Sequence, residues 1–203
     1  AQAIVQKVSV AVTTQEQQRA TSRRKVDPEV YETALKGKLI LEYAHSREQF
    51  NRAIELFQRA IDRDPTYAPA WAGLGQALWS LAAAGWEFVA PNEVRGKAIA
   101  AAERALELDD NLADAHLARA IIAIDGEWDL VKAEQHFMRA IELQPGYAAA
   151  HNMYGQILGG MPMQRFEEAR KHYDLARELD PLSPWNDLNL VAWWLYQGRP
   201  EQA

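Results

Sequence analysis

Small, aromatic and helix-breaking residues recur at fixed distances along the chain. Four segments share this pattern. A small residue is followed four residues later by an aromatic or small residue. A second small residue comes three residues after that, and a helix-breaking residue comes five residues later still. Steps of four and three place residues on one face of an α-helix, and a proline at its end stops the helix. The four segments are Ala53-Phe57-Ala60-Pro65, Ala98-Ala102-Ala105-Asp110, Ala133-Phe137-Ala140-Pro145 and Ala169-Tyr173-Ala176-Pro181.

A second predicted helix follows each breaker. We take the residue six positions after the breaker as its reference, and the residue four positions after this reference is small in most copies. A glycine inside a helix costs about 1 kcal/mol relative to alanine, so its recurrence indicates that a neighbouring helix crosses there. The reference residues, six positions after each breaker, are Trp71, His116, His151 and Asp187, and the small positions are Gly75, Ala120 and Gly155, with Val191 in the last copy.

The spacing of these helix pairs identifies the repeat. Successive breakers lie 45, 35 and 36 residues apart, and the long first interval contains an insertion at residues 85–95. Over residues 28–203 the pattern resembles the tetratricopeptide repeat (TPR), whose period is about 34 residues. The resemblance implies an all-α fold, an α-α superhelix of antiparallel helix pairs. The sequence departs from the repeat pattern at Asp110, where proline is usual, at Ala102, where an aromatic is usual, and at Arg119, where leucine is usual.

Two segments are expected, an N-terminal one at residues 1–26 and a repeat array at residues 27–203. The first is read as the helical or linker tail of a preceding domain, with a helix or the end of a strand at residues 1–12. Asp27 and Pro28 are expected to cap and begin the first repeat helix, and Asp129 to cap a later one. The expected units are 28–65, 66–110, 111–145, 146–181 and a partial unit at 182–203.

Two stretches resemble a narrower group of proteins. They are "EWDLVKAEQHFMRAIELQPGYAAAH" and "KVDPEVYETALKGKLIL", and they are similar to repeat arrays that follow winged-helix, protein kinase or adenylate cyclase domains in bacterial signalling proteins. This resemblance implies a fragment of a larger regulator, consistent with a chain that begins at Ala1. It also implies a cytoplasmic location, or a periplasmic one if the whole protein is membrane-anchored.

Composition narrows the functional classes. The chain has no cysteine, which excludes disulfides and thiolate metal sites. Its net charge is −6, divided into +4 on residues 1–26 and −10 on the remainder, and an acidic body argues against a nucleic-acid surface. No apolar run approaches the roughly 20 residues that cross a bilayer.

Catalytic and metal-binding motifs are absent from the sequence. It contains no phosphate-binding glycine loop, no H-E-x-x-H and no G-x-S-x-G. Four of the five histidines occupy equivalent repeat positions and none forms an i, i+4 pair, so we expect no metal, no cofactor and no enzymatic activity. The histidines are His45, His116, His136, His151 and His172.

Seven tryptophans can serve either the core or a ligand surface. Trp71, Trp128 and Trp194 match packing positions of the repeat, whereas three others do not fit the core pattern. Because the last unit is partial, Trp193 and Trp194 are expected to be partly exposed. The three that do not fit are Trp79, Trp86 and Trp185.

The TPR resemblance implies a concave groove that binds a protein partner as a peptide or a helix. Relatives that bind acidic tails use lysine and arginine in this groove, and that clamp is absent here. A structural spacer or dimerisation arm, with the groove filled by an intramolecular contact from residues 1–26, is the alternative. The predicted lining residues are Ala72, Gln76, Trp79, Leu117, Ile121, Ile124, Asn152, Gln156, Trp185 and Leu188.

Overall fold

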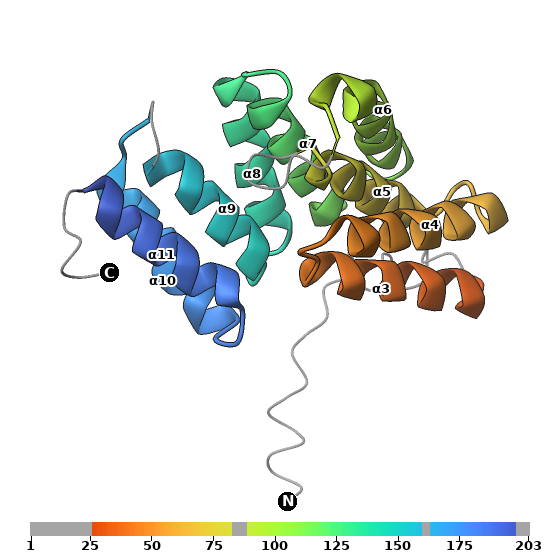
Figure 1. Ribbon diagram of the computed structural model, residues 1–203, viewed down its shortest axis with the longest axis horizontal. Helices are drawn as coiled ribbons and strands as arrows, with labels where there is room; N and C mark the ends of the chain where they lie inside the picture. The colour runs from red at the N-terminus through yellow and green to blue at the C-terminus, as the bar shows by residue number, and fades with distance from the viewer. Residues whose placement is uncertain (1–25, 83–88, 160–162, 198–203) are drawn as a thin grey trace, which may run out of the picture.

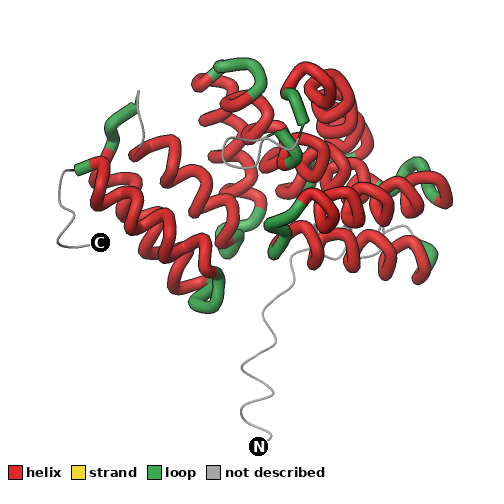
Figure 2. The backbone as a smooth tube through the Cα atoms, in the orientation of Figure 1, coloured by secondary structure: helices red, strands yellow, loops and turns green. Residues whose placement is uncertain are grey.

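The computed structural model describes residues 26–82, 89–159 and 163–197 of the 203-residue chain. All regular secondary structure in these ranges is α-helical (Figure 2), which confirms the predicted fold class. The helices are α3 (Pro28–Glu42), α4 (Arg47–Arg63), α5 (Ala68–Ser80), α6 (Pro91–Leu108), α7 (Ala113–Asp125), α8 (Leu130–Leu143), α9 (Ala148–Gly159), α10 (Phe166–Leu179) and α11 (Pro184–Tyr196).

Consecutive helices pair as hairpins, and the hairpins stack into a curved array (Figure 1). Helix α3 packs on α4, α5 on α6, α7 on α8, and α9 on α10. The first helix of each hairpin also contacts the first helix of a neighbouring hairpin, as α5 does with α3 and α7, and α9 with α11. One side of the array is therefore formed by first helices, which places them around a common concave surface.

Two helices begin at the caps that the sequence predicts. The Asp27 carboxylate accepts a hydrogen bond of 2.9 Å from the backbone N–H of Glu29, and Pro28 opens α3. The Asp129 carboxylate accepts one of 3.0 Å from the N–H of Lys132 at the start of α8. Each cap satisfies a backbone donor that has no partner inside the helix, so both predictions are confirmed.

The glycines at the crossing position touch the second helix of their hairpin. A Cβ added to Gly75 would lie 3.1 Å from the backbone nitrogen of Ala102, and one added to Gly155 would lie 2.9 Å from the ring of Tyr173. A methyl group at either position would meet these atoms inside ordinary van der Waals distance. The packing reason inferred from their recurrence is confirmed.

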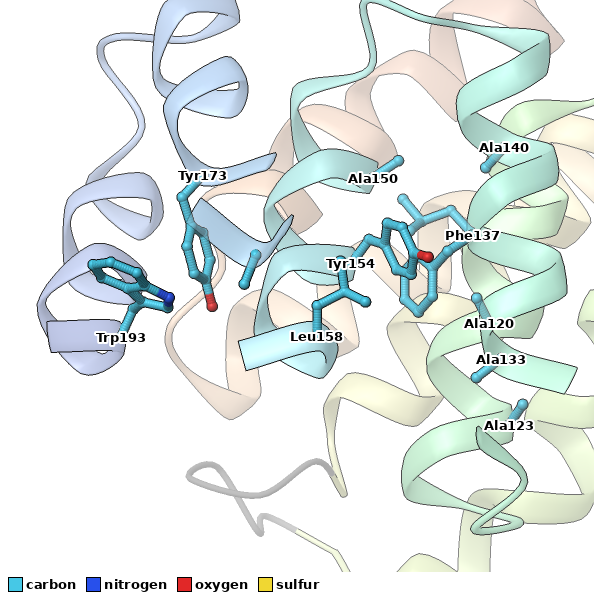
Figure 3. Close-up of a cluster of buried hydrophobic side chains, with 12 residues drawn as sticks. Ala120, Ala123, Ala133, Phe137, Ala140, Ala150, Tyr154, Leu158, Tyr173 and Trp193 are labelled. Carbon is cyan, nitrogen blue, oxygen red and sulfur yellow. The ribbon is translucent and has the colours of Figure 1, made fainter. Parts of the chain in front are cut away.

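One cluster of buried residues extends through neighbouring units from α7 to α11. Figure 3 shows Phe137 of α8 beside Tyr154 of α9, with stacked rings whose centroids lie 5.7 Å apart. The same cluster continues through Tyr173 of α10 to Trp193 of α11. Each hairpin therefore completes the core of the one before it, as a repeat array requires.

Two predictions about tryptophans were wrong. Trp128 was expected to pack, but it is 83% exposed. Its left-handed backbone, φ 57°, belongs to the turn that brings Asp129 to the start of α8, and this turn leaves the indole outside the core. Trp193 was expected to be partly exposed, but it is 4% exposed because it packs against Gly159, where the missing side chain leaves room. Trp194 is half-buried, as expected.

Some expectations concern residues outside the described ranges. These are the predictions for residues 1–25 and for Trp86. Within the insertion, Pro91 begins α6, so residues 91–95 form the first turn of that helix. Among the helices of the described ranges, none combines the length and the apolar character needed to cross a membrane.

Candidate functional site: the concave groove

The first helices of the hairpins enclose a groove of about 1040 Å³. Its lining comes mainly from α3, α5, α7, α9 and α11, so it extends along the whole described array. The surface is largely apolar, with several amide side chains among the isoleucines and aromatic rings. Pockets with this mixture bury apolar ligand groups and use a few polar groups to orient them.

Seven of the ten predicted lining residues border this groove, and three do not. The seven are Gln76, Trp79, Ile121, Ile124, Asn152, Gln156 and Trp185. Of the three others, Ala72 and Leu117 are 1% and 0% exposed and pack inside the core, while Leu188 is 56% exposed and lies outside the groove. The equivalent residue therefore faces different surroundings from unit to unit, and ligand contact by all ten stays a prediction.

Helix α3 contributes groove residues that the prediction omitted. Lys38, Leu41 and Glu42 border the groove near its first unit. Lys38 occupies the repeat position of Gln76, and Leu41 occupies that of Trp79. Extending the repeat register back to α3 would have identified both residues, because equivalent helices present equivalent faces.

The amide of Asn152 is used within the protein. Asn152 is 5% exposed, and its Nδ2 donates a hydrogen bond of 2.7 Å to Oδ1 of Asn186 on α11. Its Oδ1 accepts a hydrogen bond from Nδ2 of Asn189, also on α11. The predicted backbone-binding amide therefore joins α9 to α11 instead, since these bonds occupy both its donor side and its acceptor side.

Two other groove amides are free within the described part of the chain. Gln156 is exposed and Gln76 is half-buried, and neither side chain has a hydrogen bond there. An amide offers both donors and an acceptor, so either residue can pair with a peptide backbone in either direction. Ile121 and Ile124 supply apolar surface beside them.

A polar bridge joins distant units beside the groove. Nζ of Lys38 on α3 lies 2.8 Å from both carboxylate oxygens of Asp114, which begins the third unit. The hydroxyl of Tyr147, just before α9, also donates to Asp114, and Lys38 lies 5.5 Å from the centre of its ring. Burial and then the Asp114 charge raise the pKa of Tyr147 well above its usual value, so it remains a neutral donor.

The first residue of the repeat motif has one role in three units. Trp71 Nε1 donates a hydrogen bond of 2.9 Å to the carbonyl oxygen of Pro65 in the preceding turn. Nε2 of His116 and of His151 lies 3.0 Å from the equivalent carbonyls of residues 110 and 145. A carbonyl only accepts hydrogen bonds, so in the neutral form both histidines carry their proton on Nε2 and leave Nδ1 as an acceptor.

Each of these histidines pairs with a histidine on the second helix of its hairpin. The Nδ1–Nδ1 distance is 2.9 Å between His116 and His136 and 2.8 Å between His151 and His172. Since Nδ1 of the first ring accepts, Nδ1 of His136 and of His172 must donate. Burial, followed by the charge of the partner histidine, lowers the pKa of His172 and lowers that of His136 to about 4. His136 and His172 are therefore neutral and link the two helices of their hairpins, in agreement with their equivalent repeat positions.

Arg119, which stands where the repeat usually has leucine, is buried in the core. Its side chain is 2% exposed, and Nη2 lies 2.9 Å from both carboxylate oxygens of Glu127. Burial raises the pKa of Glu127, but the hydrogen bond and charge of Arg119 outweigh burial and lower it overall. The buried cation is thus paired, as an ion removed from water must be.

No group of three or more potential metal ligands occurs in the described ranges. The paired histidines engage each other through Nδ1 and do not converge on an open position.

Comparison with known proteins identifies the fold. Neither protein-family models nor curated protein sequences give a match. Among solved structures, the chain is similar to TTC0263, a thermophilic TPR protein from Thermus thermophilus, with 19% identity, a TM-score of 0.62, and coverage of 88% of this chain and 87% of that one. It is also similar to yeast Tom70, with 18% identity, a TM-score of 0.56, and coverage of 89% of this chain and 37% of Tom70. The fold is a TPR solenoid.

Proposed function

We propose that this chain is a protein-interaction scaffold that binds a peptide or a helix in its concave groove. The observation that supports the proposal most directly is the combination of an extended apolar groove with free amides on two of its first helices, α5 and α9. Burial of apolar ligand side chains against Ile121 and Ile124 would supply affinity, at roughly 25 cal/mol per Å² of apolar surface. Gln76 and Gln156 would hydrogen-bond the bound backbone and fix its register.

The wider setting follows from the sequence resemblance. We propose that the array is the interacting part of a larger bacterial signalling or transcription-regulating protein and works in the cytoplasm. In this proposal the chain itself has no catalytic step, no cofactor and no nucleic-acid partner, and any kinase or cyclase activity belongs to another domain. The acidic charge of residues 27–203 supports the exclusion of nucleic acid.

A structural spacer or dimerisation arm is the second candidate. The observation that favours it is the internal use of polar groups that border the groove. Asn152 is bound by α11, and Lys38 is bound by Asp114. In this candidate, residues 1–26 would fill the groove and no exchangeable partner would exist.

A pull-down from lysate of the source cell distinguishes the two functions. The baits are the full chain, Gln156→Trp and a matched control, Gln135→Trp. Gln156 is exposed and borders the groove, so an indole there would obstruct it without disturbing the core, whereas Gln135 is exposed on α8 outside the groove. We expect a protein retained by the full chain and by Gln135→Trp and lost with Gln156→Trp. Equal recovery on all three baits, with circular dichroism showing all three folded, would favour the spacer.

A further inference from the structure

We propose that the groove selects peptides with an apolar centre and basic ends, and that it rejects acidic tails. This inference rests on the proposed function and specifies the chemistry of its partner. The inference depends on which charged side chains border the groove and on which of them have an oppositely charged partner.

The only cation among the described residues that line the groove is already neutralised. Lys38 is bound by both oxygens of Asp114 at 2.8 Å, and its ammonium group also lies over the ring of Tyr147. A ligand carboxylate would have to compete with Asp114 for this ammonium group. Lys38 therefore offers little attraction to an acidic peptide.

Two carboxylates border the groove without a cationic partner in the described ranges. Glu42 is exposed at the end of α3, the first helix of the array. Asp180 is half-buried in the turn before α11, the last described helix, and its carboxylate accepts only a backbone hydrogen bond of 3.3 Å from Leu182. The two negative charges thus lie in the first unit and at the end of the fourth unit, directly before the last helix that lines the groove.

Apart from the paired Lys38, the described lining between these charges is apolar or uncharged, so no free cation there compensates a buried anion. An acidic side chain in the middle would lose hydration without gaining a cation, which is unfavourable. Lysine or arginine near either end would be attracted by Glu42 or Asp180 while remaining hydrated. Residues 27–203 carry a net charge of −10, which adds a long-range attraction for basic peptides.

Three synthetic peptide pools test this selection with the full chain. The pools share one randomised centre of leucine, isoleucine, valine, phenylalanine and alanine, and carry two lysines, two glutamines or two glutamates at each end. Fluorescence anisotropy is measured at about 50 and about 500 mM salt, because rim charges are screened at high salt. The protein variants are Glu42→Gln with Asp180→Asn, which keeps a side-chain acceptor for the turn, and the control Glu32→Gln. Glu32 is exposed on α3 and lies outside the groove.

We expect the lysine pool to bind about fivefold more tightly than the glutamine pool, and the glutamate pool to bind most weakly. The double variant should shrink this difference to about twofold, as should high salt, while Glu32→Gln should leave it unchanged. Equal binding of all three pools, or tighter binding of the glutamate pool, would overturn the charge selection and leave the interaction scaffold in place. Failure of every pool to bind would overturn the groove as a peptide site, and the selection with it.

Discussion

Substitution of Gly73 by alanine tests how closely the two helices of neighbouring hairpins approach. Gly73 lies in the middle of α5, and a Cβ there would come within 2.3 Å of the Phe57 ring on α4. Phe57 is 1% exposed and belongs to a buried cluster with residues of α3, α5 and α6, so its ring has little room to move. Gly96 is also inside a helix, α6, but a Cβ there would meet nothing within 4 Å. The two glycines form a matched pair for the same substitution.

The expected effects have opposite signs. Alanine gains about 1 kcal/mol over glycine in a helix interior, so Gly96→Ala should raise the free energy of unfolding by about that amount. At Gly73 the same gain is offset by overpacking, which costs about 1–3 kcal/mol in a well-packed core and more where atoms would overlap this closely. We expect Gly73→Ala to lower the free energy of unfolding by about 1–2 kcal/mol.

Urea unfolding followed by circular dichroism and by tryptophan fluorescence measures both variants. The two probes should be compared, because repeat arrays do not always unfold in one step. A Phe57→Leu change in the Gly73→Ala background should recover part of the loss, since it removes the overlapping ring edge. A Gly73→Ala protein that is as stable as Gly96→Ala would refute the close approach of α4 and α5.

Three further predictions follow from the polar contacts. Between pH about 6.5 and about 4, His136 is protonated in the unfolded chain but not in the folded chain. The free energy of unfolding should therefore be highest above pH about 6.5 and fall as the pH drops through this window. His136 should account for about 1–2 kcal/mol of this loss after allowance for a half-buried ring. His136→Gln should remove that share and leave the share of His172, whose pKa is also lowered, as urea midpoints at pH 7 and 5 would show. Asn152→Ala should cost about 2–3 kcal/mol by leaving Oδ1 of Asn186, which is 4% exposed, without its donor, and thermal unfolding would detect this loss. Asp114→Asn should cost less than about 1 kcal/mol, because Lys38 is half-exposed, but should strengthen binding of the glutamate-ended peptide pool by freeing that ammonium group.

Local sequence was sufficient for the helices and their pairing. The spacing Ala53-Phe57-Ala60 defines one face of a helix, and Pro65 ends that face, so the element is determined within about 12 consecutive residues. Asp27 and Asp129 act on backbone N–H groups two and three residues away, which is why their capping roles could be predicted. Four copies of one spacing then required stacked hairpins, because a single hairpin cannot bury its apolar face.

The tertiary structure alone decided which side chains face the groove. Ala72, Leu117 and Asn152 hold the same repeat position, yet the first two are buried in the core and the third is bound by α11. Lys38 and Asp114 meet across 76 positions of the chain, so no local pattern indicates their contact. The reason is that neighbouring units carry different side chains where they pack together. The surroundings of a repeat position therefore depend on residues of other units, whereas its helix depends only on residues of its own.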